Sequence, residues 1–262
     1  MHLSDPVAPP DTPAQRARDR ARLMRALNAS LAFVLLLCAV FAAQFFFRFD
    51  ALAIAPLRAD GLLGIATAPL LHGSLAHLGA NAVALLLLGT LAGSVYPRAT
   101  LRALPLIWLA AGLGPWLLGE PESRHLGASG LTHGLMYLLL LLGLLRRDRP
   151  AVAAAMIAFL LYGGMLLTVL PREAGVSWQA HLGGAVGGVL SAWLLRRSDP
   201  LPPRKRYSWE VEEDLTERDD PLEPARPREV PVLWRREAPQ AGDNVLQFQR
   251  REPPPRSDAA SD

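Results

Sequence analysis

Residues 126–134 read Leu-Gly-Ala-Ser-Gly-Leu-Thr-His-Gly, and they join a polar stretch to a long apolar run. Ser129 lies between small residues, and His133 follows it by about one helical turn. A serine of this kind at the start of a membrane helix is either a site of close helix packing or an exposed nucleophile. The residues outside the segment must decide between these two interpretations.

Apolar and charged residues are distributed unevenly along the 262 residues. Hydrophobic residues make up 51% of the chain. Residues 1–197 carry 16 Lys and Arg against 9 Asp and Glu, whereas residues 198–262 carry 11 against 15. This asymmetry is typical of a membrane protein with a polar extension. The sequence has no basic patch with interleaved aromatic residues, so we expect no nucleic-acid partner.

The apolar runs predict an all-α, polytopic membrane protein with six spans. About 20 apolar residues cross the hydrocarbon core of a bilayer, and each run here is bounded by Pro, Gly or charge. The expected spans are Asn28–Phe49, His72–Val95, Leu101–Leu118, Ala128–Leu145, Ala151–Leu170 and Trp178–Leu195. Several are short, so some helices are expected to begin within the bilayer, against protein or a wet cavity.

This pattern divides the chain into a basic arm (residues 1–27), a six-helix membrane body (28–197) and a tail (198–262). Arg residues are concentrated in the loops on the side of the N-terminus, so the positive-inside rule places both termini in the cytoplasm. The tail is rich in Pro and charge, and we expect it to be mostly disordered. Trp209 and Trp234 offer binding sites for a cytoplasmic partner; the alternative is a solvated tail with incidental tryptophans.

Five of the six histidines fall at one predicted membrane face, near the ends of three spans. They are His72, His77, His125, His133 and His181, and Asn81 and Ser129 lie at the same ends. Ionisable residues in spans are costly and usually face a bundle interior or an aqueous cavity, so this cluster predicts a site. The HExxH spacing of a zinc site is absent and no carboxylate accompanies the histidines, so we expect neither a metal nor another cofactor.

Small residues predict that the fourth and sixth spans pack closely. The pairs four residues apart are Gly130 and Gly134 on the fourth span, and Gly184 and Gly188 on the sixth. Such pairs let helix backbones approach each other. This packing brings Ser129 within reach of His181, which shares a helix face with the glycines of its own span. A histidine at hydrogen-bond distance can act as general base for a serine nucleophile.

Hydrogen-bond donors for a developing oxyanion are present on the second span and at the start of the fourth. His77 and Asn81 are four residues apart on one helix face, and both side chains can donate. The N–H of Ser129, at a helix start, adds an unpaired backbone donor. Asp and Glu are absent between Gly61 and Gly119. A Ser-His dyad is therefore expected, not a Ser-His-Asp triad.

Three motifs, in this order, resemble those of the rhomboid intramembrane serine proteases. They are His72-x4-His77-x3-Asn81, Gly127-Ala128-Ser129-Gly130 and Ala180-His181-x-Gly183-Gly184. The resemblance covers about residues 48–195. It implies a six-helix rhomboid fold that cleaves transmembrane substrates near the extracytoplasmic surface, with a partly embedded first loop before His72.

The resemblance also implies roles for individual residues. Ser129 takes the position of the nucleophile and His181 that of the general base. His77 and Asn81 take the positions that line the oxyanion hole. We assign supporting positions to His72, Gly127, Gly130 and His133.

The chain departs from the family pattern at three places. Many rhomboids carry an aromatic residue, typically Tyr, one turn after the nucleophile, and His133 stands there in this chain. We interpret His133 as a brace for His181; the alternative is a competing base. A Trp-Arg pair common in the first loop is not recognisable, and the acidic residue often found past the second span is missing around Gly93. The segment Leu131–Gly134 also resembles the rhombosortase-like branch, which leaves the substrate class open.

The leading hypothesis is an intramembrane serine endopeptidase of a bacterial cell membrane, with transmembrane proteins as substrates and the lipid bilayer as surroundings. The alternative is a rhomboid-fold pseudoprotease that binds or chaperones membrane clients without cleaving them. A small transporter is disfavoured, because most spans lack carboxylates and no inverted repeat is evident.

Overall fold

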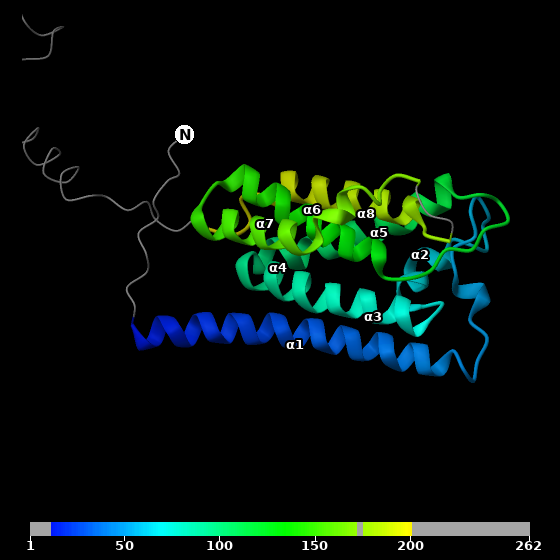
Figure 1. Cartoon of the computed structure of the whole chain (residues 1–262), viewed down its shortest axis with the longest axis horizontal. Coiled ribbons are helices and arrows are strands. Elements are labelled where there is room, and N and C mark those ends of the chain that lie inside the picture. The colour runs from blue at the N-terminus through cyan, green and yellow to red at the C-terminus, as the bar shows by residue number, and fades with distance from the viewer. Residues whose placement is uncertain (1–11, 172–174, 201–262) are drawn as a thin grey trace, which may run out of the picture. The chain divides into compact units, whose positions relative to one another are not determined.

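The computed structural model of the chain describes residues 12–171 and 175–200, which form a bundle of helices within one compact unit (Figure 1). The helices are α1 (Pro13–Ala43), α2 (Leu63–Thr67), α3 (Leu75–Ala84), α4 (Thr90–Val95), α5 (Pro97–Leu118), α6 (Ser129–Arg146), α7 (Arg149–Tyr162) and α8 (Trp178–Leu195). The described residues contain no strand, so the prediction of an all-α fold is confirmed. Apart from residues 198–200, the predicted tail lies outside the described residues.

Five helical segments of the described residues are long and apolar enough to cross a membrane. They are Pro13–Ala43, Leu75–Val95, Pro97–Leu118, Ser129–Arg146 and Arg149–Leu166. The sixth predicted span corresponds to α8, which is less apolar because it carries Gln179, His181 and four glycines. This helix packs against α5 and α6, so protein rather than lipid covers much of it. The chain is thus a multi-pass membrane protein.

Polar side chains cap the starts of α1, α3, α7 and α8. The side chains that accept a backbone N–H in the first turn are Thr12 on α1, Ser74 on α3, Asp148 on α7 and Ser177 on α8. Each of these side chains satisfies one of the N–H groups that a helix start leaves unpaired. Pro97 begins α5, where a missing N–H costs nothing.

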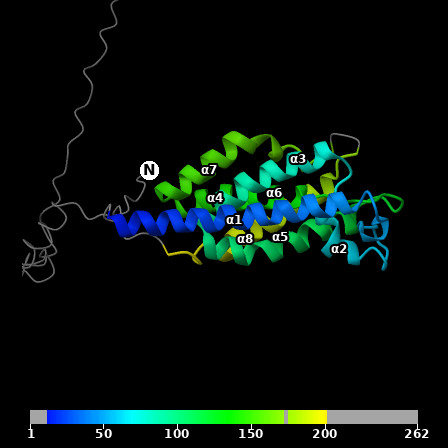
Figure 2. The ribbon, with the colours of Figure 1, turned by 90° about the horizontal axis from the view of Figure 1, so that it is seen from below.

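The first helix differs from its prediction, because it begins in the segment expected to be a basic arm. Helix α1 starts at Pro13, within the segment expected to be the arm, and ends at Ala43, before the predicted end of the span at Phe49. Ala26 is buried, and it lies close to Gly93, where an added Cβ would be 3.0 Å from that of Ala26. Arg, Ala, Gln and Leu favour a helix, which is why it continues through the polar segment. Figure 1 shows α1 along the lower edge of the bundle, and Figure 2, seen from below, shows it in front of the other helices; α1 contacts α3 and α4.

Two other predicted spans are less regular than expected. The second contains a π-helical turn over Leu85–Gly89, between α3 and α4. The fifth ends its α-helix at Tyr162 and continues as a 3₁₀ turn over Gly163–Leu166. A glycine pair begins that turn, and glycine is a poor α-helix former.

The irregular connection before α3 is held on the body by two tryptophans of α5. The indole N–H of Trp108 donates to the carbonyl of Ile65 at 3.1 Å, and that of Trp116 donates to the carbonyl of Arg58 at 3.0 Å. These bonds give partners to a backbone carbonyl of the short helix α2 and to one of the irregular segment before it. The connection therefore lies against protein, as irregular backbone in a membrane must.

Helix α8 contacts its two neighbours through glycines on two adjacent faces. A Cβ on Gly184 would overlap the carbonyl oxygen of Gly130 on α6, and a Cβ on Gly183 would overlap that of Ala110 on α5. One turn further along α8, Gly188 makes the same kind of contact with the carbonyl of Gly134 on α6. The predicted packing of the fourth and sixth spans is therefore present, and it is a backbone-to-backbone contact.

Asp199, which follows the C-terminal end of α8, links that end to the start of α5 and to the end of α6. Its carboxylate accepts the N–H groups of Arg98 at 3.0 Å and Ala99 at 2.9 Å, in the first turn of α5. An acidic side chain at a helix N-terminus is favourable by hydrogen bonding and by the helix dipole. The guanidinium of Arg146 donates to the Asp199 carbonyl at 2.8 Å, which joins the end of α6 to the same point.

We predict that Gly184→Ala lowers the free energy of unfolding by about 1–3 kcal/mol, because the methyl group overpacks the contact with α6. The matched control is Gly79→Ala on α3, where an added Cβ has no atom within 4 Å. That control is expected to be neutral or stabilising, because alanine favours a helix. Thermal unfolding in detergent followed by circular dichroism measures both, and equal effects would contradict the predicted contact.

Candidate active site

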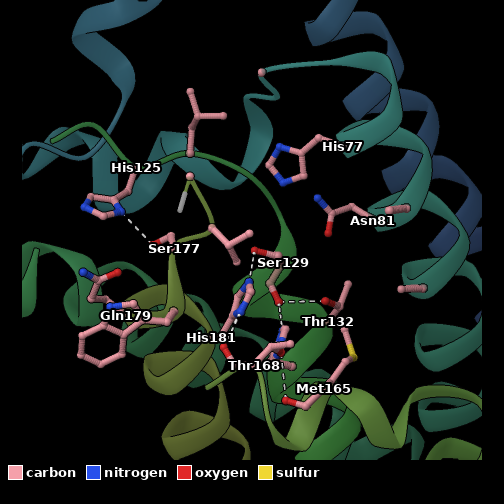
Figure 3. Close-up of a pocket in the computed structure, with 18 of the residues that line it drawn as sticks. His77, Asn81, His125, Ser129, Thr132, Met165, Thr168, Ser177, Gln179 and His181 are labelled. Atoms are coloured by element: carbon pink, nitrogen blue, oxygen red, sulfur yellow. Dashed lines mark hydrogen bonds between the residues drawn. The ribbon is translucent and has the colours of Figure 1, made fainter. Parts of the chain in front are cut away.

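A cavity of about 1130 Å³ lies among the N-terminal ends of α3, α6 and α8 (Figure 3). Residues from all three helices line it, together with the α5–α6 loop and the segment between α7 and α8. The lining includes His77, Asn81, Ser129, His133, Thr168 and His181. Polar side chains from distant parts of the sequence thus meet at one end of an apolar bundle.

Ser129 and His181 are hydrogen-bonded across the contact between α6 and α8. The Oγ of Ser129 lies 2.9 Å from Nε2 of His181, and Nδ1 of the same ring lies 3.0 Å from the carbonyl oxygen of Thr168. A carbonyl oxygen only accepts, so Nδ1 carries the ring proton and the neutral Nε2 accepts the serine hydroxyl. The pair therefore has the tautomer in which histidine can take a proton from serine.

His133 stacks on His181 and does not point at the serine hydroxyl. The ring centroids are 3.8 Å apart and the planes differ by 12°. The Nδ1 atom of His133 lies 2.7 Å from the carbonyl oxygen of Ser129, and Nε2 lies 2.7 Å from Oγ1 of Thr168. Both ring nitrogens are thus engaged away from the Ser129 hydroxyl, which is the geometry of a brace.

Thr168 does not stand out in the sequence motifs, although it contacts both histidines. Its carbonyl receives the His181 N–H and its hydroxyl pairs with His133. Every residue has a backbone carbonyl, so the residue types in a sequence do not indicate which carbonyl accepts a hydrogen bond. One signal was available: Thr168 is the only polar side chain in the segment 163–170, which reads Gly-Gly-Met-Leu-Leu-Thr-Val-Leu.

His77 and Asn81 lie on α3, across the cavity from Ser129 (Figure 3). The side-chain amide nitrogen of Asn81 is buried and has no hydrogen-bond partner among the described residues. An unpaired buried donor costs free energy, so its retention here is consistent with a hydrogen bond to a bound group. Gly127 allows the close approach of His77, because a Cβ at that position would overlap the imidazole ring.

His72 is placed behind the cavity and does not line it. It is 1% exposed, and its ring lies edge-on to that of His77 with centroids 5.1 Å apart. Its backbone pairs with the side chain of Gln44, which accepts at 3.0 Å and donates at 3.1 Å. His72 therefore contacts the candidate oxyanion site only through His77.

The part of the chain that the structure describes contains no group of three or more His, Cys, Asp or Glu arranged to hold a metal ion. Both histidines beside Ser129 are engaged with backbone carbonyls or hydroxyls.

Fold and cavity together define a polytopic helical membrane protein with a Ser-His pair at one end of its bundle. The family model of the Rhomboid domain matches residues 59–198. An uncharacterized protein of Mycobacterium tuberculosis (strain H37Rv) is 38% identical over 205 residues, which are 74% of this chain and 85% of the relative. An uncharacterized protein of Mycobacterium leprae (strain TN) is 40% identical over 147 residues, 53% of this chain and 58% of the relative. The chain belongs to the rhomboid family.

We predict that Thr168→Val lowers the free energy of unfolding by about 1–3 kcal/mol, because it leaves Nε2 of His133 buried without a partner. Thr168→Ser is the matched control, since it keeps the hydroxyl and removes only a methyl group. Thermal unfolding in detergent compares the two variants. Equal stabilities of the valine and serine variants would show that the hydroxyl contributes nothing.

Proposed function

We propose that the protein is an intramembrane serine endopeptidase that cleaves transmembrane substrates with Ser129 as nucleophile and His181 as general base. The observation that carries this proposal is the 2.9 Å approach of Ser129 Oγ to Nε2 of His181, with the other ring nitrogen held by the Thr168 carbonyl. Membership of the rhomboid family supports it, because rhomboid proteins are generally intramembrane serine proteases.

The first step forms an acyl-enzyme. The Ser129 oxygen bonds to the carbon of the scissile carbonyl while its proton passes to Nε2 of His181, and the carbonyl electron pair moves to oxygen. The resulting imidazolium protonates the leaving amine as the peptide C–N bond breaks. Water from the cavity then attacks the ester with His181 again accepting a proton, and Ser129 is regenerated.

Three donors are placed to stabilise the negative oxygen of the tetrahedral intermediate. They are the Asn81 amide, the His77 ring and the backbone N–H of Ser129 at the start of α6. Asn81 and His77 face the same cavity as the serine. Fixed donors in a site of low dielectric constant stabilise developing charge more strongly than water does.

His133 and Thr168 replace the carboxylate of a triad in this proposal. The Thr168 carbonyl fixes the tautomer of His181 and accepts its N–H throughout the cycle. The stacked ring of His133 restricts rotation of His181, so the base stays in line with the serine hydroxyl. The alternative role of His133 as a competing base is disfavoured by the engagement of both its nitrogens.

The membrane orientation belongs to the same proposal. Arg98 and Arg102 begin α5, and Arg146 and Arg196 lie at the ends of α6 and α8, so they share the end of the bundle away from the cavity. The positive-inside rule then places that end in the cytoplasm and the cavity at the extracytoplasmic face. Transmembrane segments of other proteins are the proposed substrates, and a bacterial cell membrane is the proposed location.

We predict that a fluorophosphonate probe adds one covalent label to the purified protein, at Ser129. The nucleophile must be activated to react, so Ser129→Ala should abolish labelling. Ser191→Ala, which removes a buried hydroxyl on α8 far from the cavity, is the control and should label normally. Intact-protein mass spectrometry with peptide mapping measures the adduct. A folded wild-type protein that takes up no label would support the pseudoprotease alternative.

We predict that His181→Ala slows labelling by at least about 100-fold, because general-base catalysis is lost. His133→Phe keeps an aromatic ring stacked on the base, and its labelling rate should stay much closer to that of the wild type. Rates are compared at constant pH by quenched time courses. Loss of labelling in His133→Phe together with normal labelling in His181→Ala would reverse the assignment of the base.

A further inference from the structure

His125 lines the cavity at a point where three segments of the chain meet. Its backbone N–H donates to the carbonyl of Ile54 at 3.1 Å, and its carbonyl accepts the Ile54 N–H at 3.0 Å. Its ring lies between two hydroxyls, with Nε2 2.8 Å from Ser123 Oγ and Nδ1 2.7 Å from Ser177 Oγ. The residue is only 9% exposed, and both of its hydroxyl partners are partly buried. The family motifs do not include it.

The neighbouring bonds fix the direction of each hydrogen bond to the ring. Ser123 donates its hydroxyl proton to the Glu120 carbonyl at 2.6 Å, so its oxygen must accept from Nε2–H of His125. Nδ1 of the neutral ring is then an acceptor, and the Ser177 hydroxyl donates to it. The Ser177 oxygen remains free to accept the N–H of Ala180 at 3.4 Å, which caps α8.

The contact between His125 and Ser177 repeats the register of the contact between Ser129 and His181. Each pair is separated by 52 residues, and each member of the outer pair precedes its inner counterpart by four residues. Ser177 also accepts the backbone N–H of His181 at 3.2 Å through its own carbonyl. The outer hydrogen bond therefore acts directly on the first turn of α8, which carries the proposed base (Figure 3).

We propose that His125 is a positioning residue that acts through Ser177 to hold the starts of α6 and α8 in register, so that His181 stays at hydrogen-bond distance from Ser129. Glycine contacts set the distance between the two helices, but a glycine surface has no side chains to resist sliding along it. A directional hydrogen bond four residues before the reacting pair supplies that resistance. This positioning role rests on the proposed function.

The surroundings of His125 favour its neutral imidazole, which is the form that the hydrogen bond with Ser177 requires. Burial lowers the pKa of the His125 imidazole, and the negative charge of Glu120 opposes this effect only in part. The neutral ring is therefore the form present at neutral pH, and it is the form whose Nδ1 can accept from Ser177. The two backbone hydrogen bonds with Ile54 hold the main chain of His125 in place. The hydrogen bond between its side chain and Ser177 is therefore the part of the contact that can change.

The test compares kinetic constants for a transmembrane reporter in variants of the full chain. His125→Ala keeps the Ser177 cap and should lower kcat about 10- to 100-fold with little change in KM, because the reacting groups lose alignment. His125→Asn supplies an uncharged side-chain oxygen near the position of Nδ1, and it should recover most of the lost kcat. The double variant His125→Ala/Ser177→Ala should be no slower than the slower single variant, since both remove one interaction.

A second readout is independent of catalysis. Hydrogen–deuterium exchange of the amides in residues 178–182 should accelerate in His125→Ala and return toward wild type in His125→Asn. Thr12→Ala, which removes the cap of α1, is the control for a general loss of helix stability and should leave that exchange unchanged.

The outcomes separate this proposal from the proposed function. A wild type that cleaves the reporter, with unchanged kcat and unchanged exchange in His125→Ala, overturns the positioning role and leaves the protease assignment intact. A wild type that cleaves nothing, but whose α8 amides lose protection in His125→Ala, removes the protease assignment and supports the hydrogen bond as the element that holds α8 in register.

Discussion

The close approach of α6 and α8 through glycine is the contact on which the rest of the site depends. Gly184 lies against the backbone of Gly130, and Gly188 against that of Gly134, so the two backbones meet directly at these positions. Helices in a bilayer gain little from burying apolar surface against each other, so association relies on such packing. This contact brings Ser129 and His181 to hydrogen-bond distance, which larger residues at the glycine positions would prevent.

The hydrogen bonds of the cavity define the tautomer of the candidate base, His181. The Thr168 carbonyl holds the proton of His181 on Nδ1, which leaves Nε2 for the serine. His133 fills the space beside the base and uses its own nitrogens on Ser129 and Thr168. The partners of the two histidines are hydroxyls and backbone carbonyls. Such partners suit an apolar surrounding, because a buried carboxylate would carry a large desolvation cost.

Much of this arrangement follows from the sequence, because helical periodicity places residues four apart on one face. The glycine pairs predicted the contact of the fourth and sixth spans, and the positions of His77, Asn81 and Ser129 at the ends of predicted spans predicted that they share one membrane face. The role of the Thr168 carbonyl could not be predicted, since every residue has a carbonyl. The hydrogen bond between His125 and Ser177, which joins two loops, could not be predicted either. The same is true of the start of α1 at Pro13, because the sequence there has the composition of a polar arm.

The most direct test of the central claim is cleavage of a transmembrane reporter by the purified protein in liposomes, with the products identified by mass spectrometry. A serine mechanism predicts two products from a single cut near one membrane surface with the wild-type protein, and none with Ser129→Ala. Equal product formation by both proteins would contradict a mechanism in which the Ser129 hydroxyl is the nucleophile.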